Sequence, residues 1–379
     1  MDSMLNFDAN NSPMASEILV ESNNFARTII LNRPKQLNAT SYGMLSQLLE
    51  LFISYEDDRN VKLVIVKGTG KAFCAGGDVA VIAQLCKFFW DEFGLSYVIA
   101  TFKKTQVSIL NGYVMGAGSW IATHGRFRVV TENTVFSLPE TSLGISTDAG
   151  GSYYLPRIPG SFGVYLALTG ARLDGSEMIA CGLATHFVSA SKLESLEEAL
   201  MQVNTSDPRV ISIIIDEFSQ RPDLNPESAY NSLDVIDKCF SKGTIEEILS
   251  ALQTESENKP NEEWLLRAIQ WMKKASPIAL KFTLRSMQKG STEDIAQCHI
   301  REYRLNSHIL RKDVSGDFFE GCRAVLIEKD KNPKWQPSCL EDISDEMVEY
   351  YFTKVDARGW EDLRLYTRPQ QSVSVVARL

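Results

Sequence analysis

The chain has 379 residues, of which 44% are hydrophobic and 23% are charged. These are ordinary values for a globular protein, so they exclude a largely disordered chain, and the length allows two domains with a sizeable core. With 39 basic and 48 acidic residues the formal net charge is −9, which argues against a general nucleic-acid-binding surface. The seven cysteines form no CxxC pair and no apolar stretch is long enough to cross a bilayer, so we expect neither a disulfide framework nor membrane insertion.

The first half of the chain predicts alternating strands and helices. Runs rich in β-branched residues predict strands at 18–22 and 25–31, and apolar residues spaced three and four apart predict a helix over 41–55. Further strands are expected at 61–67, 106–110, 127–131 and 134–137, and an interior helix is expected to begin within 115–123. This alternation predicts an α/β fold in which helices cover sheets.

The pattern changes near residue 216, after which helical spacing dominates and strand signals almost disappear. Ser276-Pro277 is typical of a helix start, with proline in the first turn. We therefore divide the chain into four segments. They are a flexible N-terminus at 1–16, an α/β core at 17–215, an α-helical region at 216–365 and a tail at 366–379.

Two glycine turns follow predicted strands and lead into predicted helices, at Ala75–Asp78 and at Met115–Gly118. Such turns can present unpaired backbone N–H groups to a negative charge. If the two turns faced each other they would form an oxyanion hole, which needs amides and no particular side chain. The alternative is that both turns serve packing alone. Neither matches the GxGxxG or P-loop pattern of nucleotide-binding proteins.

Two acidic residues follow in the next loop. Glu140 comes directly after Leu138-Pro139, and Asp148 lies eight residues later within a glycine-rich stretch. Two carboxylates in a partly apolar pocket have their pKa values pushed apart, which suits a division of acid and base roles. A solvated glutamate and a helix-capping aspartate are the alternatives.

Other catalytic patterns are missing from the sequence. It has no GxSxG elbow, and its four histidines show no HExxH or other metal-ligand spacing, so we expect no metal site. His124 and His186 are expected to be hydrogen-bonded structural residues, and Cys74 a small buried filler.

The sequence ends in Ala377-Arg378-Leu379, a small–basic–leucine triplet. This ending is similar to the Ser-Lys-Leu class of peroxisomal addresses, which an import receptor reads on an exposed tail. The preceding run at 367–376 contains the Pro, Gln and Ser expected of an accessible tail. We therefore expect delivery to the peroxisomal matrix.

Several ordered blocks together resemble the enoyl-CoA hydratase/isomerase (crotonase) superfamily. These blocks are Asn32–Ala39, Lys71–Asp78, His124–Arg128, Pro139–Thr141, Leu168–Leu173, Gly182–Val188, Asp317–Ala324 and Lys329–Trp335. Within the superfamily the chain is most similar to the 3-hydroxyisobutyryl-CoA hydrolase family, especially its plant peroxisomal members. The resemblance covers residues 17 to 350 and implies a spiral of ββα units followed by helices.

The resemblance also implies the roles of individual residues. It assigns the catalysis to Glu140 and Asp148 and the oxyanion amides to Gly77 and Ala117. It places contacts with the acyl-CoA substrate at Glu92, Ala75, Gly76 and Asp78.

The branch of the superfamily follows from two positions. Hydratases carry another glutamate just after the second glycine turn, where this chain has Ser119-Trp120, whereas Asp148 is the acid of the hydrolase branch. The implied reaction is hydrolysis of 3-hydroxyisobutyryl-CoA in valine breakdown, with CoA as part of the substrate and no separate cofactor.

Two other functions remain open: hydration or isomerisation on the same fold, and acyl-CoA binding by a weakly active relative. The second is motivated by departures from the family pattern. They are Ala117 in place of glycine, the Trp120 ring, Ser146-Thr147 before Asp148, and a short segment at 79–87.

Overall fold

A computed structural model describes residues 16–78, 85–116 and 118–367, with the backbone alone for residues 85–87. The chain begins with an antiparallel hairpin of β1 (Ile18–Asn23) and β2 (Ala26–Leu31). Its turn contains Asn24 at φ 48°, a conformation that asparagine tolerates better than most residues. The two strands predicted here are confirmed.

In the described part of the chain, six strands form the first sheet, in the order β1-β2-β3-β5-β7-β10. Apart from the β1–β2 hairpin, its neighbouring strands run parallel. The remaining members are β3 (Leu63–Gly68), β5 (Thr105–Leu110), β7 (Phe127–Val130) and β10 (His186–Phe187). The crossover from β2 to the parallel strand β3 contains α1 (Tyr42–Asp57), which begins where the Ser41 hydroxyl accepts a hydrogen bond from the Met44 N–H at 3.1 Å.

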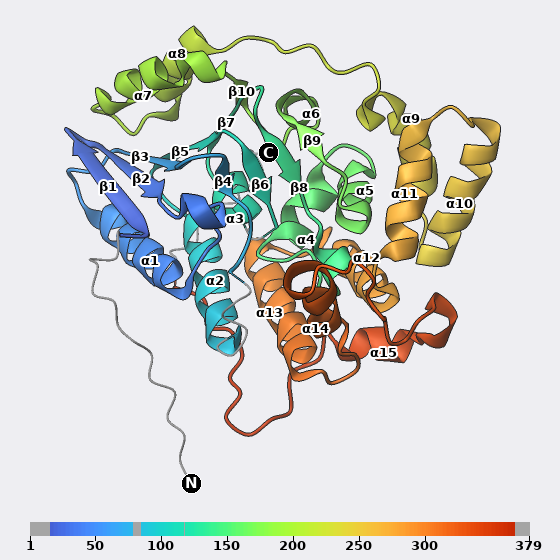
Figure 1. The fold of residues 1–379 in the computed structure, drawn as a ribbon. Helices are drawn as coiled ribbons and strands as arrows, with labels where there is room; N and C mark the ends of the chain where they lie inside the picture. Colours follow the sequence, from blue (N-terminus) through green and yellow to red (C-terminus); the bar gives the residue numbers. More distant parts are fainter. Residues whose placement is uncertain (1–15, 79–84, 117, 368–379) are drawn as a thin grey trace.

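A smaller sheet lies beside the first, with the order β4-β6-β8-β9 among the described residues. Its strands are β4 (Ala72–Cys74), β6 (Tyr113–Met115), β8 (Val135–Ser137) and β9 (Leu173–Asp174). From β3 to β8 the strands alternate between the two sheets along the chain, and helices α2 (Leu85–Ala100) and α3 (Gly118–Thr123) follow β4 and β6. This is a repeating ββα arrangement (Figure 1), in agreement with the expected core.

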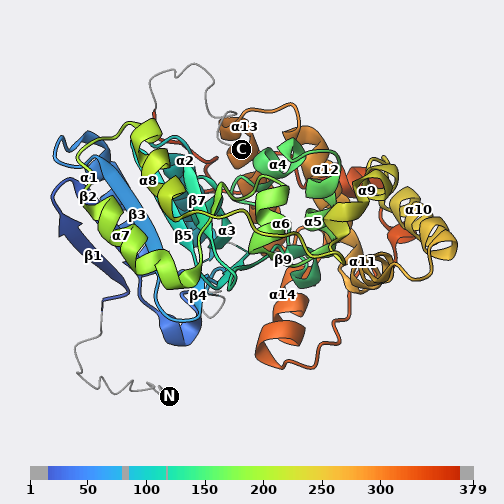
Figure 2. The same cartoon turned by 90° about the horizontal axis from the view of Figure 1, so that it is seen from above.

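Helices cover the outer face of the first sheet. Figure 2 shows α7 (Leu193–Met201) and α8 (Pro208–Phe218) lying across its strands. Their apolar side chains, including Leu196 and Ile215, form one hydrophobic cluster with Ile65 and Val107 of the sheet. Helix α8 crosses position 215/216, the predicted boundary between the α/β core and the α-helical region, and that division stays a prediction.

The chain from 229 to 350 is mostly helical, with a non-helical stretch at 328–339, which confirms the helical C-terminal region. Its main helices are α9 (Leu233–Phe240), α10 (Ile245–Asn258), α11 (Glu263–Lys274), α12 (Pro277–Gly290), α13 (Ile295–Arg311), α14 (Asp317–Cys322), the π-helical turn η7 (Arg323–Ile327) and α15 (Asp345–Tyr350). Between the sheets and these helices lie α4 (Gly151–Tyr154), α5 (Phe162–Thr169) and α6 (Gly175–Ala180). The short 3-10 helices are η1 (Pro34–Gln36), η3 (Glu140–Leu143), η4 (Leu155–Arg157), η5 (Ala190–Lys192), η6 (Ala229–Ser232) and η8 (Leu340–Asp342).

One large hydrophobic cluster joins the α/β part to the helical region. It contains Phe93 of α2 and Leu168 of α5 together with Phe282 of α12 and Leu305 of α13. Burial of this shared apolar surface fixes the C-terminal helices against the core. No helix in the described part of the chain is both long and apolar enough to cross a membrane.

Candidate active site

A cavity of about 260 Å³ opens at the carboxyl ends of β4, β6 and β8. Its walls come from both glycine turns, from α2, from the loop after β8 and from the helical region at α14 and η7. The lining residues are Ala75, Gly76, Gly77, Asp78, Phe88, Phe89, Glu92, Met115, Gly116, Pro139, Glu140, Ser142, Leu143, Ile145, Asp148, Phe318, Val325 and Leu326. Most of the wall is apolar, so the few carboxyl groups in it are poorly solvated.

The first glycine turn is held from both sides by the chain at 37–40. Ala75 N–H donates to the Leu37 carbonyl at 3.0 Å, and Asp78 N–H donates to the Thr40 carbonyl at 2.9 Å. Gly76 takes φ 110°, a conformation that favours glycine. Between these anchors the Gly77 N–H makes no hydrogen bond with any described residue, although Gly77 lines the cavity. It is therefore free to donate to a bound oxygen.

The second glycine turn lies directly against the first. A Cβ atom on Gly118 would come within 2.4 Å of the Cys74 carbonyl oxygen, and one on Gly116 within 3.8 Å of the Gly76 Cα. Gly118 must therefore be glycine for β4 and α3 to approach this closely. Ala117, the predicted second amide donor, lies outside the described residues.

Glu140 begins η3, immediately after β8 and Pro139, and its side chain is 8% exposed. Its Oε1 would be 3.5 Å from a Cβ on Gly116, so the carboxyl group lies beside the second glycine turn. Within the described structure its Oε2 is buried without a hydrogen-bond partner. Burial, followed by the charge of Asp148, raises the pKa of Glu140 to about 8. The sequence alternative of a solvated glutamate does not apply.

Asp148 lies in the loop that follows η3. This loop folds back, so that Asp148 lines the same cavity as Glu140. The backbone turns sharply after it, with Ala149 at φ 48° and Gly150 at φ 92°. Asn306 Nδ2 of α13 donates a hydrogen bond to Asp148 Oδ2. Burial, followed by the charge of Glu302, raises the pKa of Asp148 to about 7, and the Asn306 hydrogen bond partly offsets this rise.

Glu92 is a third acid of the same cavity and is 1% exposed. The Trp120 indole Nε1–H donates to Glu92 Oε1 at 3.1 Å. Burial, followed by the charge of Asp148, raises the pKa of Glu92 well above its ordinary value. Trp120, one of the departures from the family pattern, is itself 1% exposed and is not among the residues that line the cavity.

The other predicted substrate contacts lie at the first glycine turn. Ala75, Gly76 and Asp78 line the cavity with Gly77, and Asp78 also forms an ion pair with Arg33 at 2.8 Å. His124 Nε2 lies 3.3 Å from the Ala149 carbonyl oxygen. Residues 79–84, most of the short segment of the sequence analysis, lie outside the described residues.

The histidine and cysteine expectations agree with the described contacts. His186 Nδ1 lies 2.8 Å from the Thr185 hydroxyl, and Cys74 is fully buried beside the first glycine turn. Within the described ranges no three His, Cys, Asp or Glu side chains come together in a group that could hold a metal ion.

Sequence reasoning missed the walls contributed by distant segments. Phe88 and Phe89 line the cavity from α2, and Phe318 and Leu326 line it from α14 and η7. It also missed Asn306 and Glu302 of α13, which bond to Asp148 and to the backbone just after it. No local pattern distinguishes these residues from ordinary core and helix positions.

The model of the enoyl-CoA hydratase/isomerase family matches residues 26–352 of this chain. The chain belongs to this family. Members of the enoyl-CoA hydratase/isomerase family include the Arabidopsis thaliana protein named "Probable 3-hydroxyisobutyryl-CoA hydrolase 2", which is 52% identical over 96% of this chain and 99% of its own length.

Two other Arabidopsis thaliana relatives carry different names. "3-hydroxyisobutyryl-CoA hydrolase-like protein 1, mitochondrial" is 40% identical over 89% of this chain and 86% of its own. "Small ribosomal subunit protein mS47" is 41% identical over 92% of this chain and 87% of its own. Among solved structures, a carnitinyl-CoA dehydratase from Mycobacterium thermoresistibile superposes with a TM-score of 0.83 at 31% identity, over 93% of this chain and all of that one.

Proposed function

We propose that the protein hydrolyses 3-hydroxyisobutyryl-CoA, or a similar short 3-hydroxyacyl-CoA, to the free acid and CoA. The observation that carries the proposal is the meeting of Glu140 and Asp148 in one largely apolar cavity beside the free Gly77 N–H. The 52% identical relative with a 3-hydroxyisobutyryl-CoA hydrolase name supports the same substrate. The position of a hydratase's second glutamate is taken here by Ser119-Trp120, and Trp120 is buried behind Glu92.

In this mechanism the thioester carbonyl oxygen accepts a hydrogen bond from the Gly77 N–H, and the Ala117 N–H is the proposed second donor. Both amides stabilise the negative charge that develops on that oxygen. Glu140, in its ionised form, either attacks the carbonyl carbon or removes a proton from the attacking water. The carbon–sulfur bond then breaks and CoA leaves as the thiolate. If Glu140 was the base, the proton that it removed from water passes to the thiolate. If Glu140 was the nucleophile, water then hydrolyses the acyl–Glu140 anhydride, which releases the free acid and restores the carboxylate.

Asp148 is proposed to bind the 3-hydroxyl group of the substrate or to carry a proton. Glu92, Ala75, Gly76 and Asp78 are proposed to contact the acyl-CoA. The raised pKa of Glu140 keeps its carboxyl group neutral in the resting site at neutral pH, so the reactive form increases as the pH rises toward 8. CoA enters as part of the substrate, and the mechanism requires no other cofactor.

The test is release of CoA thiol from 3-hydroxyisobutyryl-CoA by the purified protein, followed with a thiol reagent. Steady release that Glu140→Gln abolishes is the expected result. Hydration of an enoyl-CoA without thiol release would instead assign the protein to the hydratases. Tight CoA binding with neither reaction would favour the binding protein, the alternative motivated by the departures at Ala117, Trp120, Ser146-Thr147 and residues 79–87.

We also propose that the reaction serves valine breakdown and that Ala377-Arg378-Leu379 directs the protein to peroxisomes. The relative named as mitochondrial provides the competing compartment. A fluorescent protein fused in front of the complete chain should enter peroxisomes, and the same fusion without the last three residues should stay in the cytosol. Import that is unchanged by the deletion, or delivery to mitochondria, would contradict this assignment.

A further inference from the structure

Helix α13 presents one buried polar face to the loop that carries Asp148. His299, Glu302 and Asn306 are spaced three and four residues apart, which places them on one side of the helix. All three are at most 1% exposed, although each is polar. Buried polar groups are costly unless they are hydrogen-bonded, so their partners explain why they are there.

The first two residues of this face hold the backbone just after Asp148. Glu302 accepts hydrogen bonds from the Gly150 N–H at 2.8 Å and the Ser152 N–H at 2.9 Å. His299 Nε2 lies 2.9 Å from the Ser96 hydroxyl, which donates to the Ala149 carbonyl at 2.9 Å. The turn at 149–152 is thus fixed from α13 directly and through α2.

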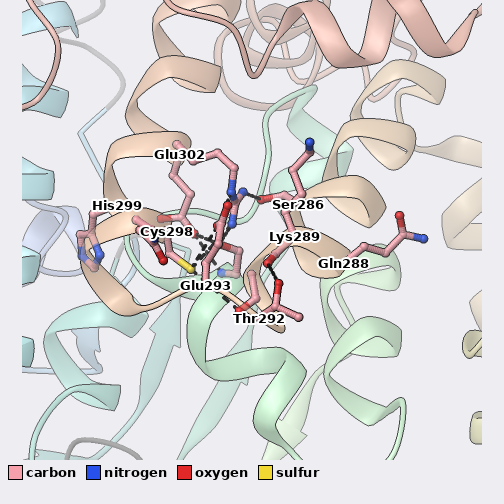
Figure 3. Close-up of polar contacts among 12 residues, drawn as sticks. Ser286, Gln288, Lys289, Thr292, Glu293, Cys298, His299 and Glu302 are labelled. Atoms are coloured by element: carbon pink, nitrogen blue, oxygen red, sulfur yellow. Dashed lines mark hydrogen bonds and ion pairs between the residues drawn. The ribbon is translucent and has the colours of Figure 1, made fainter. Parts of the chain in front are cut away.

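Glu302 is in turn held in a wider polar network, part of which Figure 3 shows. Arg301 Nη2 donates to the Ser152 hydroxyl at 2.9 Å, and that hydroxyl donates to Glu302 Oε1. Arg301 Nε also pairs with Glu293 at 2.6 Å, and its Nη1 donates to Ser286 at 2.6 Å. The network ties α12 and α13 to the turn, so the turn cannot shift without breaking several buried hydrogen bonds.

Asn306 differs from the other two because it contacts the carboxyl group itself. Its Nδ2 donates to Asp148 Oδ2, while its Oδ1 is buried without a partner among the described residues. A purely structural asparagine in the core would be expected to satisfy both ends of its amide. The Asp148 contact is therefore the one that accounts for an amide at this position.

We propose that Asn306 is a positioning residue, whose amide holds the Asp148 carboxyl group in the orientation that the hydrolase reaction requires. The inference rests on the function proposed above. The C-terminal helical region then contributes directly to the site, because Asn306 of α13 holds the carboxyl group of Asp148 in the α/β core.

The charged surroundings of Asp148 determine what the loss of this amide would do. Glu92 on α2, Glu140 on η3 and Glu302 on α13 all disfavour a negative charge on Asp148, and burial acts in the same direction. His299 of α13 packs against the turn with its pKa lowered to about 3 by burial, so it is neutral and supplies no positive charge. His124 also faces the turn, beside Gly150. The Asn306 hydrogen bond opposes the rise in the Asp148 pKa, so its removal raises that pKa further.

The experiment compares the wild type with Asn306→Ala and Asn306→Leu, the second of which keeps the branching and number of side-chain heavy atoms and removes the donor. Ser307→Ala is the matched control, because Ser307 is the next residue of α13 and is 5% exposed. Among the described residues its hydroxyl bonds only within the helix, to the Tyr303 carbonyl at 2.8 Å. Hydrogen bonds to charged groups contribute enough that we expect kcat/KM for 3-hydroxyisobutyryl-CoA to fall about tenfold or more in both Asn306 variants. The acid limb of the pH profile should move to higher pH, and the control should change neither quantity.

A direct titration of Asp148 separates this inference from the proposed function. Carboxyl carbon NMR, with the Asp148 signal identified by Asp148→Asn, measures its pKa without any substrate. A higher Asp148 pKa in Asn306→Ala and Asn306→Leu supports the positioning role even if the wild type releases no thiol, a result that would overturn only the hydrolase assignment. Folded Asn306 variants with an unchanged Asp148 titration and an unchanged pH profile would overturn the positioning role.

Discussion

Replacing Glu140 by glutamine should abolish thiol release and, above neutral pH, make the protein more stable. The carboxyl group is buried, and its pKa rises from 4.5 to about 8. A group whose pKa is raised on folding contributes stability below its unfolded pKa and loses that contribution as the pH rises through its folded pKa. The neutral amide of glutamine escapes this loss because it does not titrate.

The size of the effect follows from the same values. The difference between 4.5 and about 8, at about 1.4 kcal/mol for each pH unit, gives an upper limit of about 5 kcal/mol above pH 8. The amide N–H of the introduced glutamine has an acceptor nearby, the buried Thr147 hydroxyl. This hydroxyl lowers the pKa of Glu140, and it has no other partner in the described structure. A gain of about 2–5 kcal/mol is therefore expected at pH 8.5, and less than about 1 kcal/mol at pH 5.

The assay is urea unfolding of the wild type and Glu140→Gln at pH 5 and pH 8.5. Glu194→Gln, which changes an exposed glutamate of α7 in the same way, is the control and should have no effect at either pH. The reasoning is refuted if Glu140→Gln changes the free energy of unfolding equally at both pH values, because a titrating group cannot produce a pH-independent difference.

Three further outcomes are expected. Thiol release should increase as the pH rises through about 7 to 8, because the acidic pair titrates there and the ionised form is reactive; a profile that is flat from pH 6 to 9 would contradict this. Trp120→Phe removes the hydrogen bond to Glu92 and leaves a small void, so urea unfolding should reveal a loss of about 2–4 kcal/mol, and an unchanged stability would mean that the indole N–H is dispensable. Gly118→Ala should lower the free energy of unfolding by about 2–3 kcal/mol, because its Cβ would lie 2.4 Å from the Cys74 carbonyl oxygen. Gly77→Ala should lower it much less, because the nearest atom to its Cβ would be 3.4 Å away. Equal losses of stability in the two variants would refute the close-approach argument.

Local patterns in the sequence were sufficient for most of the elements. Apolar alternation and spacing placed β1, β2, β3, β5, β7 and α1 to within about two residues, because side-chain periodicity reflects which face of an element is buried. The sixth strand of the first sheet, β10, was not predicted, because its two residues are too few to show a pattern. The two glycine turns and Glu140 were found the same way, since each directly follows a strand. The interior helix expected within 115–123 begins later, at Gly118, because β6 occupies the chain through Met115.

The sequence by itself thus determined the ββα order, the helical C-terminal region, the family and the acidic residues that carry the proposed chemistry. Only the tertiary structure decided how these acids are supported: Asn306 is 158 positions from Asp148, and Glu302 is 152 positions from Gly150. It also placed Trp120 behind Glu92 and closed the cavity with Phe318. Burial, hydrogen bonding and the repulsion between carboxyl groups depend on distance in space, which no local spacing along the chain encodes.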